Sequence, residues 1–565
     1  MAWITLPFAI GVTLISSLAW LIYVSYRQRA KIHQLRRQGF RMPQNWSWIF
    51  GHLLVLQKAR SKFPSDAAAW TTALRELALG ATDTEVLLVD LWPVSPPLLI
   101  VADPEVAVQI TNKYNLPKTR HNSEDSMKPI VGGPSIISMN GEEWKLWRGL
   151  FNPGFSAANM TTYVPYIVDC VQVFCEKLEE RAGKVLFQLE DLTTRLTTEV
   201  IAKVTLDVDL NYQHQDHVLP HAFNTIINWH SMWNPMIWAN PLRPLVQKYY
   251  GRIIKRFIRK ELQARFLELQ TGQTSIAKRG RAKSIIAIAL EGYIAEQGNA
   301  SGNSTSTGEL NEHFTGYASN QIRLFLFAGN DTTSSSIIYL YHLLSQNPLV
   351  LEKLRVEHDA IFGPNVVEAT DMLKEKPALL NQCHYTLAVV KETLRHYAPA
   401  GTLRSGVSNV VLTDRHNNSY PMDGICATII HAAMHMNPYF WVRPTEFLPE
   451  RFVVDPEHEL YPNPAAYRPF EQGPRNCPGI TLVYNEMRIA LVLTARRFIV
   501  QPAYEEWDEL QAMNMGFLKT LGKRLGVVAT EPNTVYGDRA YQTDTAGTHP
   551  KDGYPCRVEL LNRSL

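Results

Sequence analysis

The feature that most constrains this 565-residue chain is one cysteine in a turn-forming segment near its C-terminus. Cys477 lies in the loop Phe470–Gly479, seven residues after an aromatic side chain, with Arg475 two positions before it and Gly479 two positions after it. No second cysteine or histidine lies nearby to complete a zinc site. Gly473 and Gly479 would permit unusual backbone dihedrals and the close approach of a ligand. The loop therefore predicts a single thiolate presented to a bound group.

A lone thiolate of this kind suits a haem iron, because sulfur occupies one axial position while the opposite face stays free for oxygen. Backbone N–H groups of a tight turn can hydrogen-bond the sulfur and tune it. The alternative is a buried structural cysteine, the usual state of an isolated one. The joint presence of Phe470, Gly473, Arg475 and Gly479 around Cys477 favours the haem ligand.

Composition indicates a large globular protein. Hydrophobic residues make up 45% of the chain, which is enough for a sizeable core. Because 56 basic residues face 53 acidic ones, nothing in the charge suggests a nucleic-acid partner. The six cysteines form no CxxC pair, so we expect free thiols in a reducing cytosol.

Residues 4–26 carry no charge and would span about 35 Å as a helix, enough to cross a bilayer. A basic cluster follows between Arg27 and Arg41, and no acidic residue precedes Asp66. A cleaved signal peptide is the alternative, but it would begin with a basic region and end at a small-residue cleavage site. We therefore expect a single-pass anchor over residues 1–26 in the endoplasmic reticulum membrane, with the rest of the chain facing the cytosol.

Beyond this segment, the pattern predicts a mainly α fold with small β-sheets. Long helices are expected over residues 311–346 and 377–397, each ending just before a proline. Residues 402–430 alternate short β-type runs with turn signals.

In the second helix, Glu392 and Arg395 share one face and can pair. Arg451, in the segment Pro449–Phe452, could join them. The alternative is a surface ion pair that contributes little. A buried network would instead fix a local geometry, since it is costly unless every charge is satisfied.

Small residues beside an acid and an alcohol, Ala328–Thr333, interrupt the first long helix. A helical glycine costs about 1 kcal/mol relative to alanine, and threonine can bend the helix by bonding to the preceding turn. The segment could make room for a ligand and supply a proton route through Asp331 and Thr332. The alternative is a kink without function.

Two further candidate sites contain an arginine. Trp144 and Arg148 lie on one helical face and could donate to carboxylates, although an amphipathic surface helix would explain them equally well. Arg404, in the strand region, is a weaker candidate of the same kind.

Together these motifs closely resemble the cytochrome P450 family of haem-thiolate monooxygenases. They occur in the family's order, and the resemblance covers roughly residues 75–535. The hinge after the anchor, usually Pro-rich in the family, has only Pro43 here. The resemblance implies a cytochrome P450 fold with an N-terminal transmembrane helix. The implied division is an anchor at 1–26, a basic linker and start of the globular region at 27–74, and a catalytic domain with a C-terminal tail at 75–565.

The resemblance also implies a role for each residue. Cys477 would be the axial thiolate of haem b, and Asp331 and Thr332 would organise proton delivery. The enzyme would insert one oxygen atom from O2 into a C–H or C=C bond of a hydrophobic small molecule. The implied haem-binding residues are Trp144, Arg148, Arg404, Phe470, Arg475, Cys477 and Gly479, and the implied structural residues are Glu392, Arg395 and Arg451.

No flavin or nucleotide-binding module is visible in the sequence. For a membrane-anchored family member, electrons from NADPH would therefore come through NADPH–cytochrome P450 reductase, with or without cytochrome b5. Residues 446–557 resemble filamentous-fungal members, which indicates a secondary-metabolite pathway such as a mycotoxin route. The candidate substrate contacts are Phe325, Phe327, Ala400 to Leu403, and Phe517.

Two alternatives stay open. One is a family member that uses the haem for isomerisation or dehydration without activating oxygen; such members tend to lack the alcohol that Thr332 supplies. The other is a non-catalytic haem-binding protein, which would need neither Asp331 nor Thr332.

Overall fold

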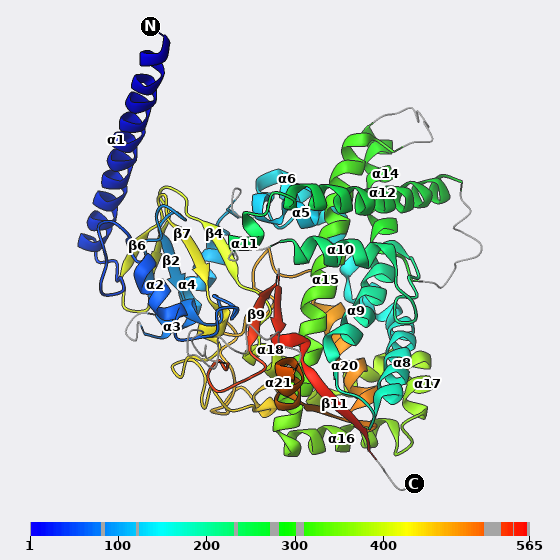
Figure 1. Ribbon diagram of the computed structural model, residues 1–565. Helices are drawn as coiled ribbons and strands as arrows, with labels where there is room; N and C mark the ends of the chain where they lie inside the picture. The colour runs from blue at the N-terminus through cyan, green and yellow to red at the C-terminus, as the bar shows by residue number, and fades with distance from the viewer. Residues whose placement is uncertain are drawn as a thin grey trace.

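The computed structural model describes residues 2–80, 85–119, 124–230, 235–271, 282–300, 310–513, 533–545 and 547–561. These residues form a predominantly helical molecule with four small sheets, as predicted (Figure 1). The α-helices are α1 (Ala2–Arg37), α2 (Leu53–Arg60), α3 (Ala73–Leu79), α4 (Pro104–Val108), α5 (Ser126–Val131), α6 (Gly141–Phe151), α7 (Ala157–Thr162), α8 (Val164–Arg181), α9 (Leu189–Leu206), α10 (Val218–Asn228), α11 (Pro235–Trp238), α12 (Arg243–Gln270), α14 (Ile285–Ala300), α15 (Glu312–Gln346), α16 (Pro348–Phe362), α17 (Glu368–Glu375), α18 (His384–His396), α19 (His431–Met434), α20 (Ile480–Thr494) and α21 (Tyr504–Met513). Short helical turns are η1 (Gln109–Lys113), η3 (Asn152–Phe155), η4 (Pro377–Gln382), η5 (Pro449–Phe452) and η6 (Lys551–Gly553).

The largest sheet has four strands in the order β1-β2-β7-β4. Strand β2 pairs antiparallel with β1 and parallel with β7, and every residue of these three strands is buried. The sheet lies beside α2, α3 and α4, while most of the long helices lie on the other side of the molecule (Figure 1). The strands of the four sheets are β1 (Val86–Val89), β2 (Leu98–Val101), β3 (Phe187–Gln188), β4 (Thr402–Ser405), β5 (Val411–Thr413), β6 (Ser419–Pro421), β7 (Cys426–Ile429), β8 (Phe498–Pro502), β9 (Gln542–Thr545), β10 (Gly547–Pro550) and β11 (Pro555–Leu560).

Helix α15 runs through the centre of the helical part and organises the site. Asn311 caps its N-terminus, where the side-chain oxygen accepts the N–H of His313 at 2.8 Å. The predicted interruption at Ala328–Thr333 does not occur, because the helix continues unbroken to Gln346. A Cβ on Gly329 would lie 2.7 Å from the side chain of Ile201, so glycine lets α9 pack closely here.

The predicted helix over 377–397 is divided into η4 and α18. Cys383, between them, has a ψ of 67°, outside the helical range. The carboxylate of Glu357 accepts the N–H groups of Tyr385 and Thr386 at 2.6 and 2.8 Å, and so caps the new N-terminus. The strands predicted over 402–430 are present as β4 to β7.

The N-terminal helix α1 projects from the sheet side of the molecule (Figure 1). The described residues include no helix that is both long and apolar enough to cross a membrane, which differs from the transmembrane span predicted over residues 4–26. The helix also continues beyond Tyr26 into the predicted linker. Its basic end is docked, because buried Arg29 pairs with Asp90 and donates to the carbonyl of Trp48 at 3.0 Å.

Candidate active site

A cavity between α15 and the cysteine loop brings together residues from distant parts of the chain. Most of its surface is apolar, with Ile136, Phe155, Ile201, Leu324 and Phe325 among the lining residues. The predicted site residues that line it are Trp144, Arg148, Phe325, Thr332, Ala400, Gly401, Thr402, Phe470, Arg475, Cys477 and Gly479.

The loop that carries Cys477 is held by its own backbone. The N–H of Cys477 donates to the carbonyl of Phe470 at 2.9 Å, and the N–H of Asn476 donates to that of Gly473 at 3.1 Å. Gly473 has a φ of +82°, and a Cβ there would lie 2.5 Å from the carbonyl oxygen of Thr111. Glycine is therefore required at this position.

Gly479 does not have the unusual backbone dihedrals predicted for it. This residue has an ordinary φ of −81°, and a Cβ would be 3.8 Å from the Cys477 sulfur, a normal contact. Burial raises the pKa of the Cys477 thiol, while the Gly479 N–H and the charge of Arg148 oppose that rise. Both groups therefore favour the thiolate that a metal ion would bind.

Two of the predicted basic side chains, Arg148 and Arg475, line the cavity. Arg148 donates through Nη2 to the carbonyl oxygen of Asn476 at 2.9 Å. The guanidinium of Arg475 lies 4.4 Å from the ring centroid of Trp144, and its Nη1 donates to the carbonyl of Met139 at 2.9 Å. The predicted residues Trp144, Arg148 and Arg475 thus meet at one edge of the cysteine loop.

The buried arginines around the cysteine loop make only part of their possible hydrogen bonds. The buried Nε atoms of Arg148, Arg404 and Arg475 have no hydrogen-bond partner among the described residues. Burial and the neighbouring cations lower the pKa of Arg475 to about 10, and burial lowers that of Arg404 to about 10. Arg404 does not line the cavity, but its charge acts on Arg475 and on Lys118, which does. Such a cluster calls for anionic groups of a ligand.

Lys118 is a site residue that sequence reasoning missed. Burial, followed by the charge of Arg404, lowers its pKa to about 7. A lysine in the irregular segment before α5 carries no spacing signal, so only the fold could place it beside Arg404 and Arg475.

The acid and the alcohol of α15 lie in different surroundings. Thr332 lines the cysteine cavity and donates from Oγ1 to the carbonyl of Ala328 at 2.9 Å. Asp331 lines a separate polar hollow, where its Oδ1 lies 2.8 Å from Nε2 of His549. Consecutive helical residues differ by about 100° in direction, which explains the separation.

Glu392 forms a fully buried network with two arginines. Arg395 donates to both of its oxygens at 2.7 and 2.8 Å, and Arg451 donates from Nε at 3.2 Å. All three side chains are inaccessible to solvent. Arg395 also donates to the carbonyls of His435 and Pro444 at 2.8 and 2.7 Å, so the network ties α18 to the segment that leads to the cysteine loop.

The candidate substrate contacts divide into two groups. Phe325, Ala400, Gly401 and Thr402 line the cysteine cavity. Phe327 lines a small hollow beside α10, and Leu403 packs against the sheet core, so neither lines that cavity. Phe517 lies outside the described residues.

The cytochrome P450 family model matches residues 84–524. The chain belongs to the cytochrome P450 family. It is similar to cytochrome P450 monooxygenase polC of Polytolypa hystricis, with 34% identity over 562 residues, covering 98% of this chain and 96% of the relative. It is also similar to cytochrome P450 monooxygenase acrF of Aspergillus aculeatus, with 31% identity over 530 residues, covering 88% and 99%. We conclude that this P450 is a monooxygenase.

The fold agrees with a solved structure of the same family. The heme domain of cytochrome P450DA superposes with a TM-score of 0.66, at 18% identity, over 92% of this chain and 97% of that one. At this identity the likeness concerns the fold alone.

Proposed function

We propose that this P450 monooxygenase inserts one oxygen atom from O2 into a hydrophobic small molecule, by hydroxylation or epoxidation, in a fungal secondary-metabolite pathway. The observation that carries the proposal is the cavity that Cys477 shares with Thr332 and a mainly apolar wall. Such a wall binds apolar ligands and excludes water. The similarity to monooxygenases from Polytolypa and Aspergillus supports the fungal pathway.

The residues of the cavity fit haem b. Cys477 would ligate the iron, and the incompletely paired Arg148, Arg404 and Arg475 would hold the two propionates, with Trp144 beside them. When bound, the haem would supply the oxidising chemistry through its thiolate-ligated iron.

The protein's own residues would position substrate and protons. Phe325, held edge-on against Phe151 and Phe155 at centroid distances of 5.2 and 5.1 Å, gives the cavity a rigid apolar wall. Thr332 directs its hydroxyl hydrogen to Ala328, so the oxygen is left to accept a hydrogen bond from a proton-bearing group in the cavity.

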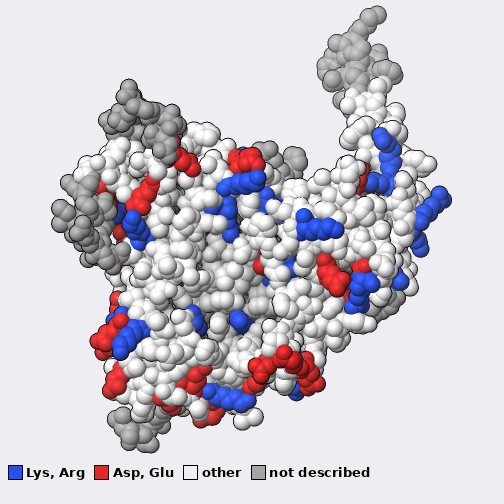
Figure 2. All heavy atoms as spheres, turned by 180° about the vertical axis from the view of Figure 1, so that it is seen from behind, with Lys and Arg blue, Asp and Glu red and all other residues white. Residues whose placement is uncertain are grey.

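Electrons from NADPH would come from NADPH–cytochrome P450 reductase, with or without cytochrome b5. Membership of the P450 family supports a separate reductase as the electron source. On the face shown in Figure 2, basic and acidic side chains are interspersed, unlike the continuous basic patch typical of nucleic-acid binding.

We propose the endoplasmic reticulum membrane as the location, with the catalytic part facing the cytosol. Helix α1 exposes Leu14, Ile15, Leu18 and Ile22, side chains that a lipid surface would cover. The full chain should sediment with microsomes through a high-salt wash, whereas a variant lacking residues 1–26 should stay in the supernatant. Equal sedimentation of the two proteins would exclude α1 as the membrane contact.

The function is tested by isotope incorporation. Microsomes that contain this chain and the reductase, supplied with NADPH, 18O2 and a fungal metabolite extract, should form a product that carries one 18O atom. A product without 18O would support the isomerase or dehydratase alternative. Binding of haem without any substrate turnover would support the non-catalytic one.

In the same assay, Thr332→Ala should consume NADPH while releasing mostly peroxide. Loss of one positioned group from a proton-transfer route typically costs about 10²–10⁴-fold in the step that needs it. Ser336→Ala is the matched control, because Ser336 lies one turn further along α15 and makes the same type of bond, from Oγ to the Thr332 carbonyl at 2.7 Å. Unchanged product yield per NADPH in Thr332→Ala would contradict the proposed role.

A further inference from the structure

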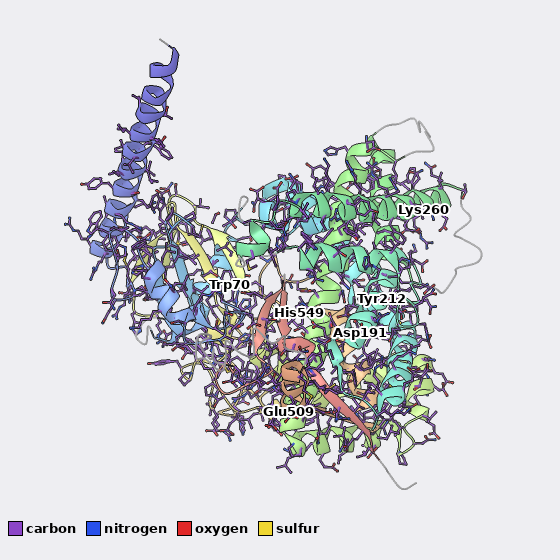
Figure 3. The ribbon with its side chains drawn as sticks, viewed as in Figure 1. Trp70, Asp191, Tyr212, Lys260, Glu509 and His549 are labelled. Carbon is purple, nitrogen blue, oxygen red and sulfur yellow. The ribbon has the colours of Figure 1, made fainter. Side chains whose placement is uncertain are left out.

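A polar hollow of about 400 Å³ borders α15 at Asp331, apart from the cysteine cavity. Glu190 and Asp191 of α9 and His549 of β10 are part of its charged lining. Figure 3 places His549 on the C-terminal hairpin near the centre of the molecule, with Asp191 on the neighbouring helix. The hollow therefore connects the acid of α15 with charged groups from two other elements.

His549 lies between two carboxylates. Its Nε2 is 2.8 Å from Oδ1 of Asp331, and its Nδ1 pairs with Glu190. Exposure falls along this row, from 28% for the Glu190 side chain to 14% for His549 and 6% for Asp331. The three groups thus lead from the solvent side to the interior of the protein.

The hairpin is locked against α15 at this point. A Cβ on Gly547 would lie 1.8 Å from Oδ2 of Asp331, so only glycine allows the strand to approach so closely. Ser335, one turn along α15, donates from Oγ to the carbonyl of Thr548 at 2.6 Å. These contacts fix the ring of His549 relative to Asp331.

The charges around the ring favour its protonated form. Burial lowers the pKa of His549, but Asp331 and Glu190 outweigh burial and raise it well above the ordinary value. Two other carboxylates line the hollow, and both are occupied by cations: Asp191 pairs with Arg195 at 3.1 Å and Asp552 with Arg539 at 3.1 Å. The pairs with His549 therefore stabilise the fold at neutral pH and are lost as the pH rises through the raised pKa.

We propose that His549 is a positioning residue that pairs with Asp331, and that protons for the reaction enter through this polar hollow. The inference rests on the proposed oxygen insertion. The imidazolium donates its Nε2 proton to Oδ1 of Asp331, Asp331 passes that proton on toward Thr332 on the same helix and is ionised again, and the neutral ring takes a replacement proton from water in the hollow.

The first experiment observes His549 itself. In an NMR titration of histidine-labelled protein, with the signal assigned by its loss in His549→Gln, the ring should stay protonated well above its ordinary pKa of 6.5. Glu190→Gln keeps the side-chain shape but removes one charge, and should shift the titration to lower pH. A midpoint near 6.5 in the wild type would overturn the proposal, whatever the enzyme's activity.

The second experiment measures product formed per NADPH as a function of pH. In the wild type, this yield should fall at alkaline pH, as the ring of His549 loses its proton. In His549→Gln the yield at neutral pH should be lower by about tenfold or more, and the alkaline fall should be absent. Lys62→Gln is the control: it breaks an ion pair with Glu76, 2.7 Å long and away from the hollow, and should leave the profile unchanged.

A wild-type yield and pH profile in His549→Gln would overturn the proposal. If His549→Gln does not fold, Glu190→Gln decides the question. An unchanged titration of the His549 ring and an unchanged pH profile of the yield in Glu190→Gln would also overturn the proposal. A wild type that inserts no oxygen would instead refute the proposed function, while the titration still reports on the ion pairs.

Discussion

Cys477→Ser is expected to abolish oxygen insertion and to remove the strongly red-shifted Soret band of the reduced carbon monoxide complex. Serine keeps the shape of the loop, but its hydroxyl does not ionise to supply the axial anion that a thiolate provides. The loop itself should persist, since the backbone bond from residue 477 to Phe470 does not depend on the side chain. Visible absorption of the purified variant measures the result.

Cys175→Ala is the control for this substitution. Cys175 is also buried and free, but its sulfur lies 3.8 Å from the carbonyl of Leu493, away from the cavity. This variant should keep the band and the activity. A thiolate-type band that survived in Cys477→Ser would show that another residue ligates the iron.

Glu392→Ala is expected to lower the free energy of unfolding by about 3–5 kcal/mol, because it leaves Arg395 and Arg451 as uncompensated buried cations. It also removes the acceptor of the Leu448 N–H, which donates to Glu392 at 2.9 Å. Urea unfolding followed by circular dichroism would measure the loss. Reduced haem content should accompany it, since these contacts hold the segment before the cysteine loop.

The surface pair of Arg443 and Glu446 provides the comparison. Their charged groups are 3.2 Å apart, but the side chains are 49% and 51% exposed. Glu446→Gln should therefore cost at most about 1 kcal/mol. Similar losses in Glu392→Ala and Glu446→Gln would show that the buried network adds nothing beyond a surface pair.

The same network predicts a pH dependence. Burial alone would raise the pKa of Glu392, but Arg395 and His396 hold it far below its usual value. Because the pKa of Glu392 is lower in the folded protein than in the unfolded one, its carboxylate stabilises the fold fully above the unfolded pKa of 4.5. This stabilisation is lost as the pH falls through the folded pKa. The difference in stability between wild type and Glu392→Ala should therefore be constant near neutral pH and shrink only in strong acid.

The elements that the sequence predicted well depend on neighbours in the chain. The loop around Cys477 needs Gly473 at one turn position, and Glu392 and Arg395 meet because helical residues three apart share a face. The start of α15 at Asn311 is likewise a local capping signal. Such short-range rules hold wherever the segment lies in the fold.

Predictions that needed distant partners were less complete. The break before α18 comes from Glu357 on another helix, which captures the N–H groups of Tyr385 and Thr386. The helix that begins in the apolar N-terminal segment continues past Tyr26 to Arg37, and its Arg29 pairs with Asp90, about sixty residues later. A hydropathy pattern predicts neither the contact of Glu357 with α18 nor the pair of Arg29 and Asp90.

Residue types at short spacing were enough to single out the cysteine loop, the acid–alcohol pair and the charges of the Glu392 network. Only the tertiary structure decided where those groups point. It placed Thr332 in the cysteine cavity and Asp331 in a separate hollow, and it brought His549 within 2.8 Å of an acid 218 residues earlier. The physical reason is that side-chain direction and long-range charge pairing depend on how helices and strands pack, which no local pattern records.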